Sequence, residues 1–384
     1  MKTMSSRERT HAAMEHREVD RTPVMMWIEP HTAVKMATRV CPPSSPVNKA
    51  LWNGVVRLSD ALPDPDLAQG AQLAVHPFMK PYLLELGADI VDVNYGSPLL
   101  WLRKVRRRDG KLRFTDMYGI ERSIGGLYLE PTACPCPDPE SLERYKFPDM
   151  SHPIHYAHVA AVRRMFPDAF LVCMCPGAQD HGQFIHPMPK LYAGMIEYPD
   201  VIKSFFRKMR DHAIQIIRGA MSAGADAVHI LDDYGTQNSM FISKAMWKEF
   251  TFPVLAAEIE EIHKLGGKAM LHSCGTIMPL VDLFVDAGLD ALHPIQPLPG
   301  NNLDEIVEKF GDRLCFVTGI DVQRIGAMAP HEVYDSILST ARTASRKRGF
   351  ILAHTNGLQH DTPVENLQAM MRAIADVKTM ANRP

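Results

Sequence analysis

The sequence predicts an α/β protein built as a (β/α)8 TIM barrel, and three observations point to that fold. Eight short apolar segments alternate with helical patterns along the 384 residues, and eight strand–helix units suit a closed barrel. Each apolar segment is continuously hydrophobic, as expected of parallel strands that are covered on both faces. No glycine-rich nucleotide fingerprint follows the first segment, which disfavours the alternative of an open, doubly wound sheet.

An internal repeat marks three of the predicted strands. The segments ELGADIVDV (85–93), SAGADAVHI (222–230) and DAGLDALHP (286–294) each run from a helix end through a glycine and an aspartate into an apolar stretch. Glycine at the end of a helix favours a left-handed turn into the next strand. The other five strands are predicted at residues 22–28, 169–175, 268–272, 313–319 and 349–354.

Helical patterns lie between the strands, for example over residues 198–221 and 243–265. Residues 1–384 are predicted to form a single barrel domain that begins with an N-terminal helical extension over residues 1–21. Residues 100–150 are expected to be an insertion that contains a β-hairpin. Within it, three arginines at 106–108 precede an Asp-Gly pair, which indicates a solvent-exposed hairpin turn.

Composition and charge argue against several classes of protein. The formal net charge of −2 gives no general attraction to nucleic acid or to an anionic membrane. The N-terminal residues are charged throughout, unlike a secretory signal, and no window approaches the ~18 apolar residues of a membrane span. The seven cysteines are an odd number, which fits reduced thiols or metal ligands. We therefore expect a cytoplasmic protein with no nucleic-acid partner and no membrane partner.

Polar side chains follow the predicted strands at the ends where a barrel of this kind carries its chemistry. His272 and Cys274 are two residues apart, so in an extended chain they point to the same side. Imidazole and thiolate suit zinc, which at catalytic sites takes three protein ligands and keeps one open position. The competing interpretation is structural: a buried thiol beside a hydrogen-bonded histidine in a tight turn. The other strand ends supply Glu29, His31, Asn94, Cys175, Asp232, Asp233, Gln296, Asp321, His354, Asn356 and His360.

Five segments give the chain a resemblance to a known family. They are SSRERTHAAMEHREVDRTPV (5–24), DDYGTQ (232–237), HSCG (272–275), TGID (318–321) and ILAHTNGLQHDTPVENL (351–367). In this order, and spread over nearly the whole chain, they resemble the uroporphyrinogen decarboxylase (URO-D) superfamily. The resemblance implies a (β/α)8 barrel with N-terminal extensions. It also implies one of two chemistries: cofactor-free decarboxylation in haem synthesis, or zinc-dependent methyl transfer to or from a corrinoid protein.

The segment after the first strand distinguishes these chemistries. The true decarboxylases carry a motif resembling RxAGRY there. An arginine of this motif binds the carboxylates of the substrate. This chain has MMWIEPHTAVKM (25–36), with Glu29 and no arginine before Arg39. The methyltransferases carry His-x-Cys after the fifth strand, which His272 and Cys274 match, and a further cysteine after the eighth. At the position of that last cysteine this chain has Asn356, although a neutral amide is a poor zinc ligand.

The replacement of that cysteine leaves three alternatives open. In the first, Asn356 contacts substrate at a site whose metal is held differently. In the second, the metal is absent and Cys274 acts by itself. In the third, the remaining zinc ligand comes from another strand end, with the candidates Glu29, Cys175, Asp232, Asp233 and His354.

The resemblance thus implies a zinc-dependent methyltransferase that moves a methyl group between a small methylated substrate, or a thiol acceptor, and the cobalt of a corrinoid (cobalamin) cofactor. The corrinoid protein would be a separate partner, because this chain lacks the Asp-x-His-x-x-Gly motif that anchors the cofactor. The alternatives are decarboxylation of a tetrapyrrole carboxylate, as in uroporphyrinogen decarboxylase, and a non-catalytic barrel that serves as a binding protein. Catalytic roles are expected for Asp232 and Asp233, and substrate binding for Asn94, Gln296, Asp321 and Asn356.

Overall fold

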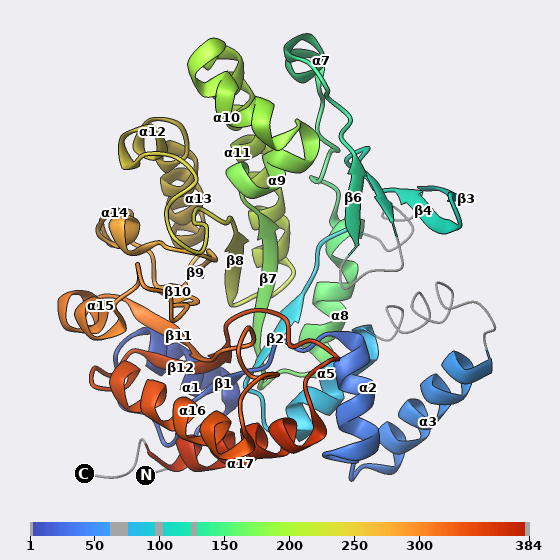
Figure 1. Cartoon of the computed structure of the whole chain (residues 1–384), viewed down its shortest axis with the longest axis vertical. Coiled ribbons are helices and arrows are strands. Elements are labelled where there is room, and N and C mark those ends of the chain that lie inside the picture. The colour runs from blue at the N-terminus through green and yellow to red at the C-terminus, as the bar shows by residue number, and fades with distance from the viewer. Residues whose placement is uncertain (1–2, 62–75, 97–102, 124–128, 381–384) are drawn as a thin grey trace. The chain divides into compact units, whose positions relative to one another are not determined.

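The computed structural model describes residues 3–61, 76–96, 103–123 and 129–380 (Figure 1). Its main sheet is a closed barrel of parallel strands in the order β1-β12-β11-β10-β9-β8-β7-β2. The (β/α)8 barrel that the sequence predicts is confirmed. The strands are β1 (Val24–Met25), β2 (Ile90–Val93), β7 (Phe170–Pro176), β8 (Ala227–Leu231), β9 (Lys268–His272), β10 (Ala291–His293), β11 (Cys315–Ile320) and β12 (Phe350–His354).

Helices follow the strands along the chain, as the alternating pattern predicts. Two 3-10 helices, η1 (Pro153–Tyr156) and η2 (Met278–Leu280), precede α8 and α14. The α-helices are α1 (Ser6–Met14), α2 (Pro30–Arg39), α3 (Pro46–Ala61), α5 (His76–Glu85), α7 (Pro139–Arg144), α8 (Ala157–Met165), α9 (Ala178–Ile185), α10 (Met188–Glu197), α11 (Pro199–Ser222), α12 (Lys244–Phe250), α13 (Phe252–Lys264), α14 (Val281–Asp286), α15 (Leu303–Phe310), α16 (Pro330–Ala344) and α17 (Val364–Met380).

Two elements differ from their predicted lengths. The helix expected over 243–265 is divided into α12 and α13, because Pro253 stands in the first turn of α13 and lacks the N–H that a continuous helix needs. The first strand, expected over 22–28, is only two residues long in β1. Its continuation is an isolated bridge between Ile28 and Leu358.

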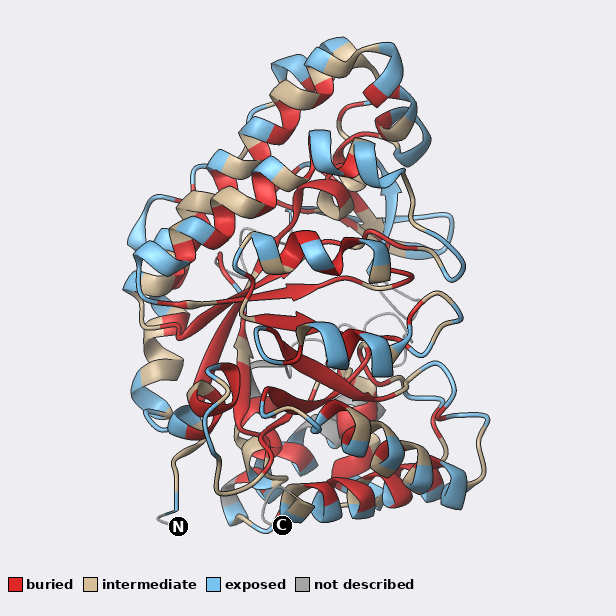
Figure 2. Ribbon diagram, turned by 90° about the vertical axis from the view of Figure 1, so that its left-hand side faces the viewer, coloured by how far each residue is buried: buried red, intermediate tan, exposed pale blue. Residues whose placement is uncertain are grey.

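The barrel strands are almost entirely buried, which explains their continuous hydrophobicity (Figure 2). Every residue of β10, β11 and β12 is buried, and β7, β8 and β9 each contain a single residue of intermediate exposure. Both faces of a parallel strand in a barrel are covered, so polar side chains are unfavourable on either face.

The aspartate of the internal repeat has the same structural role in all three copies. In each copy it stands just before a strand and accepts a hydrogen bond from a backbone N–H at the start of the neighbouring strand. This contact fixes the starts of two adjacent strands relative to each other. The pairs are Asp89 with Val24 N (3.0 Å), Asp226 with Leu171 N (2.8 Å) and Asp290 with Ala269 N (2.8 Å).

The N-terminal extension is held by buried ion pairs. Arg9 contacts Asp20 through Nε and Asp89 through Nη1, both at 2.6 Å. Arg21 also contacts Asp89, at 2.8 Å. Arg9, Asp20 and Arg21 of the RER…EVDR segment therefore attach helix α1 to the residue before β2, which is a structural role.

The described part of the insertion contains a four-stranded antiparallel sheet, ordered β3 (Arg103–Arg108), β4 (Lys111–Thr115), β5 (Glu121–Ser123) and β6 (Glu130–Ala133), followed by α7. Asp109 and Gly110 join β3 to β4 with φ angles of 51° and 75°. Two positive φ angles are typical of a two-residue hairpin turn, and the Asp-Gly pair favours them. Residues 100–102 and 124–128 of the predicted insertion lie outside the described residues.

By packing, the chain separates into two compact units. The first unit comprises residues 1–91, 294–297 and 303–384, and the second comprises residues 92–293 and 298–302. The single domain predicted over 1–384 stays a prediction. Among the described residues, no helix is both long and apolar enough to cross a membrane.

Candidate functional site

Three potential metal ligands meet in the second unit. They are Asp233, two residues after β8, His272, the last residue of β9, and Cys274. His272 Nε2 lies 3.4 Å from Cys274 Sγ and 3.5 Å from Asp233 Oδ1. Asp233 Oδ1 also accepts a hydrogen bond from Cys274 N, at 2.7 Å. We call these three residues the ligand group.

The spacing and the donor atoms of the ligand group fit zinc. Zinc bonds of about 2.3 Å to sulfur and 2.0–2.2 Å to nitrogen and oxygen, at tetrahedral angles, place the nitrogen about 3.6 Å from the sulfur and about 3.4 Å from the oxygen. The observed 3.4 and 3.5 Å agree within the ~0.2 Å expected of a real site. Cys274 and Asp233 keep part of their surface exposed, so this group is reachable from outside.

Hydrogen bonds between two loops hold the ligand group in place. The loop after β8 and the loop after β9 are joined by a bond from Tyr234 N to Ser273 Oγ (3.0 Å) and one from Thr276 N to Thr236 O (2.9 Å). Along the sequence, the bonded residues follow Asp233 directly on the first loop and stand on both sides of Cys274 on the second. The position of the two side chains therefore depends on the docking of the two loops.

A contact between two glycines lets these loops approach closely. Gly275 has a φ of +85°, and a Cβ atom added to it would lie 2.2 Å from the carbonyl carbon and oxygen of Gly235. A side chain at 275 would meet rigid backbone rather than a movable side chain. The glycine in the HSCG segment is thus required by the approach of the DDYGTQ loop.

A second group of histidines lies beside the ligand group, and the sequence interpretation missed it. His229 in β8, His272 and His293 in β10 are buried, with ring nitrogens within 4.8 Å of one another. His272 Nδ1 and His293 Nδ1 are 2.8 Å apart, a hydrogen-bond distance. The repeat contained the signal, because its DAVH and DALH segments place His229 and His293 at equivalent positions.

Burial keeps His229 and His272 neutral. It lowers the pKa of His272 to about 4, and it lowers the pKa of His229 well below its usual value, with a further contribution from the neighbouring histidines. Neutral imidazole is the form that binds metals.

Additional carboxylates surround the ligand group. Asp232 is 2% exposed, and its Oδ1 accepts a hydrogen bond from Asp180 N at 2.6 Å. Burial raises the pKa of Asp232 to about 7. Burial, followed by the charges of Asp233 and Asp232, raises the pKa of Asp180 well above its usual value. Acidic groups this close together favour a bound cation. Asp180, in the first turn of α9, was not singled out from the sequence, where no motif marks it.

Two other predicted site residues of the second unit lie outside the ligand group. Cys175 is buried with its Sγ 4.0 Å from Ala213 O, and burial raises the pKa of its thiol well above the usual value. Asn94 is exposed, and its backbone carbonyl contacts the ring of His158. Neither side chain is placed with Asp233, His272 and Cys274.

The first unit contains His354 and Asp321. His354 is fully buried: its Nδ1 accepts a hydrogen bond from Trp27 N at 3.3 Å, and its Nε2 lies 3.4 Å from Met370 Sδ. Both ring nitrogens of this candidate ligand are therefore engaged inside the first unit. Asp321 accepts a hydrogen bond from Gln323 N at 3.0 Å in a turn after β11, and burial raises its pKa.

Glu29, Gln296 and Asn356 also belong to the first unit. The Glu29 carboxylate packs against Gly357, where an added Cβ would lie 2.2 Å from Glu29 Oε1. Asn356 Oδ1 accepts a hydrogen bond from Gly357 N at 2.6 Å, and Gln296 is buried. Glu29 and Asn356 thus share one contact residue, while the roles predicted for these side chains stay predictions.

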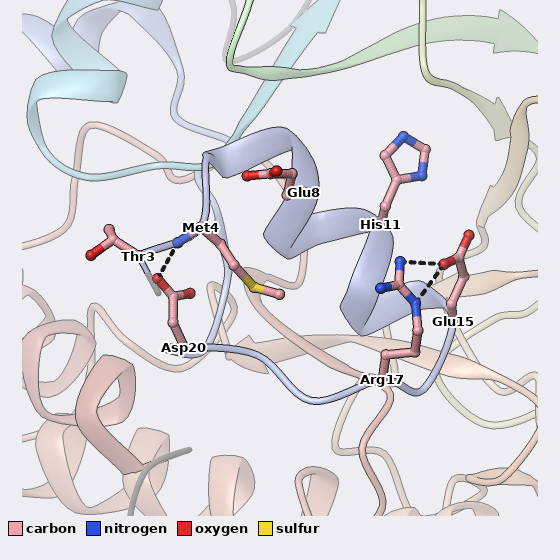
Figure 3. Close-up of a pocket in the computed structure, with 7 residues that line it drawn as sticks. All are labelled: Thr3, Met4, Glu8, His11, Glu15, Arg17 and Asp20. Atoms are coloured by element: carbon pink, nitrogen blue, oxygen red, sulfur yellow. Dashed lines mark hydrogen bonds and ion pairs between the residues drawn. The ribbon is translucent and has the colours of Figure 1, made fainter. Parts of the chain in front are cut away.

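A cavity of about 540 Å³ opens on the N-terminal extension of the first unit (Figure 3). Among its lining groups, Met4 N donates to Asp20 (2.9 Å) and Arg17 donates to Glu15 (2.6 Å), and Asp20 also accepts from Arg9. This cavity includes none of the site residues that the sequence predicts.

Comparison with known proteins identifies the family. A family model described as uroporphyrinogen decarboxylase (URO-D) matches residues 134–377, which include the whole ligand group. The chain belongs to the URO-D family. The resemblance inferred from its five segments is therefore confirmed.

Curated relatives of this URO-D protein are distant. The uroporphyrinogen decarboxylase of Anaeromyxobacter sp. (strain Fw109-5) is 26% identical over 181 residues, which cover 46% of this chain and 48% of the relative. The uroporphyrinogen decarboxylase of Coxiella burnetii (strain RSA 331) is 18% identical over 305 residues, covering 72% of this chain and 79% of the relative. The first match thus spans about half the length of that relative.

One solved structure has a similar fold over nearly the whole length. A methyltransferase from Methanosarcina mazei superposes with a TM-score of 0.64 and covers 97% of this chain and 99% of its own. The two sequences are 17% identical, so the likeness concerns the fold.

Proposed function

We propose that this URO-D protein is a zinc-dependent methyltransferase that moves a methyl group between a small methylated substrate, or a thiol, and the cobalt of a separate corrinoid protein. The observation that supports it best is the ligand group, in which Asp233 lies with His272 and Cys274. In this proposal Asp233 takes the part of the cysteine that the resemblance expects after the last barrel strand, where this chain has Asn356. Carboxylate, imidazole and thiolate together make a three-ligand set of the catalytic kind.

In this proposal Asp233, His272 and Cys274 hold the metal. A bound zinc would make a thiol nucleophilic at neutral pH, or polarise the heteroatom that carries the methyl group. The loop contacts fix the three ligands before substrate arrives, so little reorganisation is needed. The partial exposure of Cys274 and Asp233 leaves a side on which substrate and the corrinoid partner would approach.

Decarboxylation of a tetrapyrrole carboxylate is the second candidate function, because both curated relatives named above are uroporphyrinogen decarboxylases. The segment after the first strand disfavours it. A substrate with several carboxylates would find no arginine there before Arg39, where the resemblance to the true decarboxylases expects one. The carboxylate, imidazole and thiolate of the ligand group favour the metal-dependent candidate.

The deciding experiment compares zinc content and zinc affinity of the purified protein with those of three single variants: Asp233→Asn, His272→Ala and Cys274→Ala. We expect about one zinc per wild-type chain and an affinity at least tenfold lower in each variant, because each loses one of three ligands. Methyl transfer between methylcobalamin and a thiol should fall in parallel. Cys41→Ser is the matched control, since Cys41 is also a partly exposed thiol but lies in the first unit.

Two results would contradict this proposal. One is a wild-type protein that takes up no zinc under metal-replete conditions. The other is conversion of uroporphyrinogen to coproporphyrinogen by the wild type and by Cys274→Ala at equal rates, which would favour the decarboxylase.

A further inference from the structure

His272 faces two different groups with its two ring nitrogens. Nε2 points to Cys274 Sγ and Asp233 Oδ1, at 3.4 and 3.5 Å. Nδ1 points to His293 Nδ1, at 2.8 Å. A neutral imidazole carries one proton, so the contact made by one nitrogen decides what the other can do.

The contact with His293 admits two proton arrangements. If His272 donates from Nδ1, its Nε2 keeps a lone pair and can bind a metal. If His293 donates instead, the proton of His272 sits on Nε2 and blocks the metal-binding nitrogen. Only the first arrangement is compatible with the ligand group.

The distance between the two Nδ1 atoms is that of a hydrogen bond and not of two ligands on one metal. Two nitrogens bound to a tetrahedral zinc at 2.0–2.1 Å lie about 3.3 Å apart. The observed 2.8 Å is shorter and matches a nitrogen donor and its acceptor. The contact of His293 with His272 is therefore better described as support for one ligand than as part of a second metal site.

We propose that His293 is a positioning residue that fixes His272 in the tautomer with its proton on Nδ1 and so makes Nε2 available to a metal. This inference rests on the proposed zinc site. In this arrangement His293 carries its own proton on Nε2 and acts on the metal only through His272.

The barrel makes this pair rigid. His293 and His272 are direct partners in the parallel register of β10 and β9, so their backbones cannot shift independently. Their rings are 4.9 Å apart with an interplanar angle of 35°. His293 is fully buried and His272 is 6% exposed, so water is a poor competitor for the Nδ1 hydrogen bond. Partners of this kind typically change metal affinity by about 10–100-fold when they are removed.

The test uses three variants of the full chain. His293→Leu removes the acceptor, whereas His293→Asn offers an amide oxygen close to the position of Nδ1. His229→Leu is the matched control, because His229 is equally buried and its ring lies 5.3 Å from that of His293. We expect zinc affinity to fall about 10–100-fold in His293→Leu, and to stay within a few-fold of wild type in His293→Asn and His229→Leu.

A second readout needs no metal. Nitrogen-15 NMR of histidine-labelled, metal-free protein should show the His272 proton on Nδ1 in the wild type, and a shift toward Nε2 in His293→Leu. A wild-type His272 protonated on Nε2 would overturn the inference, as would unchanged zinc affinity in His293→Leu. A loss of zinc in His229→Leu as large as in His293→Leu would also overturn it, and would point to a three-histidine metal site. If the wild type binds no zinc, the proposed function fails, and the NMR result alone decides the role of His293.

Discussion

Gly275 illustrates what a single residue decides at this site. It stands between the thiol of Cys274 and the bond from Thr276 to the neighbouring loop, and its φ of +85° disfavours any side chain. Its approach to Gly235 leaves no room for one in any case. The His-x-Cys spacing alone places two candidate ligands, but the glycine after them lets Asp233, the third ligand of the proposed site, come within reach.

We predict that Gly275→Ala lowers zinc affinity at least tenfold while the chain remains folded. The added Cβ must push the loop after β8 away, which separates Asp233 from Cys274. Zinc titration and circular dichroism of the variant measure the two effects. Gly266→Ala is the control, because Gly266 also has a positive φ (+76°) but open space around its Cβ position. Both variants should lose about 1 kcal/mol of stability from backbone strain, and equal zinc affinities would refute the steric explanation.

At the scale of strands and helices, the shared role of Asp89, Asp226 and Asp290 explains the internal repeat of the sequence. Each copy couples a glycine that ends a helix to a carboxylate that holds the start of the neighbouring strand. In the third copy the carboxylate of Asp290 also contacts His263, at 2.7 Å. Although burial raises the pKa of Asp290, the hydrogen bonds from His263 and Ala269 N and the charge of Lys268 lower it below its usual value.

Asp290→Asn should therefore destabilise the protein in a pH-dependent way. The amide can still accept from Ala269 N, so the variant removes mainly the charge. A carboxylate with a lowered pKa stabilises the fold above its ordinary pKa, and this contribution disappears as the pH falls through the lowered value. We expect a loss of about 1–2 kcal/mol at pH 7 that begins to shrink near pH 4 and disappears as the pH falls through the lowered pKa. Urea unfolding between pH 3 and 8 measures it. Asp286→Asn, at an exposed position, should show no such dependence.

For the molecule as a whole, the proposed metal should contribute to stability. A ligand that binds only the folded state raises the free energy of unfolding by about 2.7 kcal/mol at 100 times its dissociation constant. For a chain of 384 residues that unfolds cooperatively, this corresponds to roughly 3 °C in melting temperature.

Removing zinc with a chelator should accordingly lower the melting temperature of the wild type by a few degrees, and readding zinc should restore it. Calorimetry with and without chelator measures the shift. Cys274→Ala should melt at the same temperature under both conditions, because it has lost a ligand of the proposed site. A chelator effect of equal size in that variant would place the metal elsewhere.

The sequence by itself determined the fold and part of the site. The barrel follows from eight continuously apolar segments, since hydrophobic periodicity is a local property of the chain. The adjacency of His272 and Cys274 also follows, because residues two apart in extended chain share a side. Family membership was likewise visible in five local segments.

Tertiary structure alone decided which side chains join that pair. Asp233 was one of five candidates for the third ligand, and only the docking of two loops, about 40 residues apart in sequence, brings it to His272. His293 lies beside His272 because of the register between β9 and β10, and no local sequence pattern predicts that register. Contacts between strands depend on how the barrel closes. The sequence could therefore predict which polar residues lie at the ends of strands. Which of those side chains come into contact depends on the order and register of the strands.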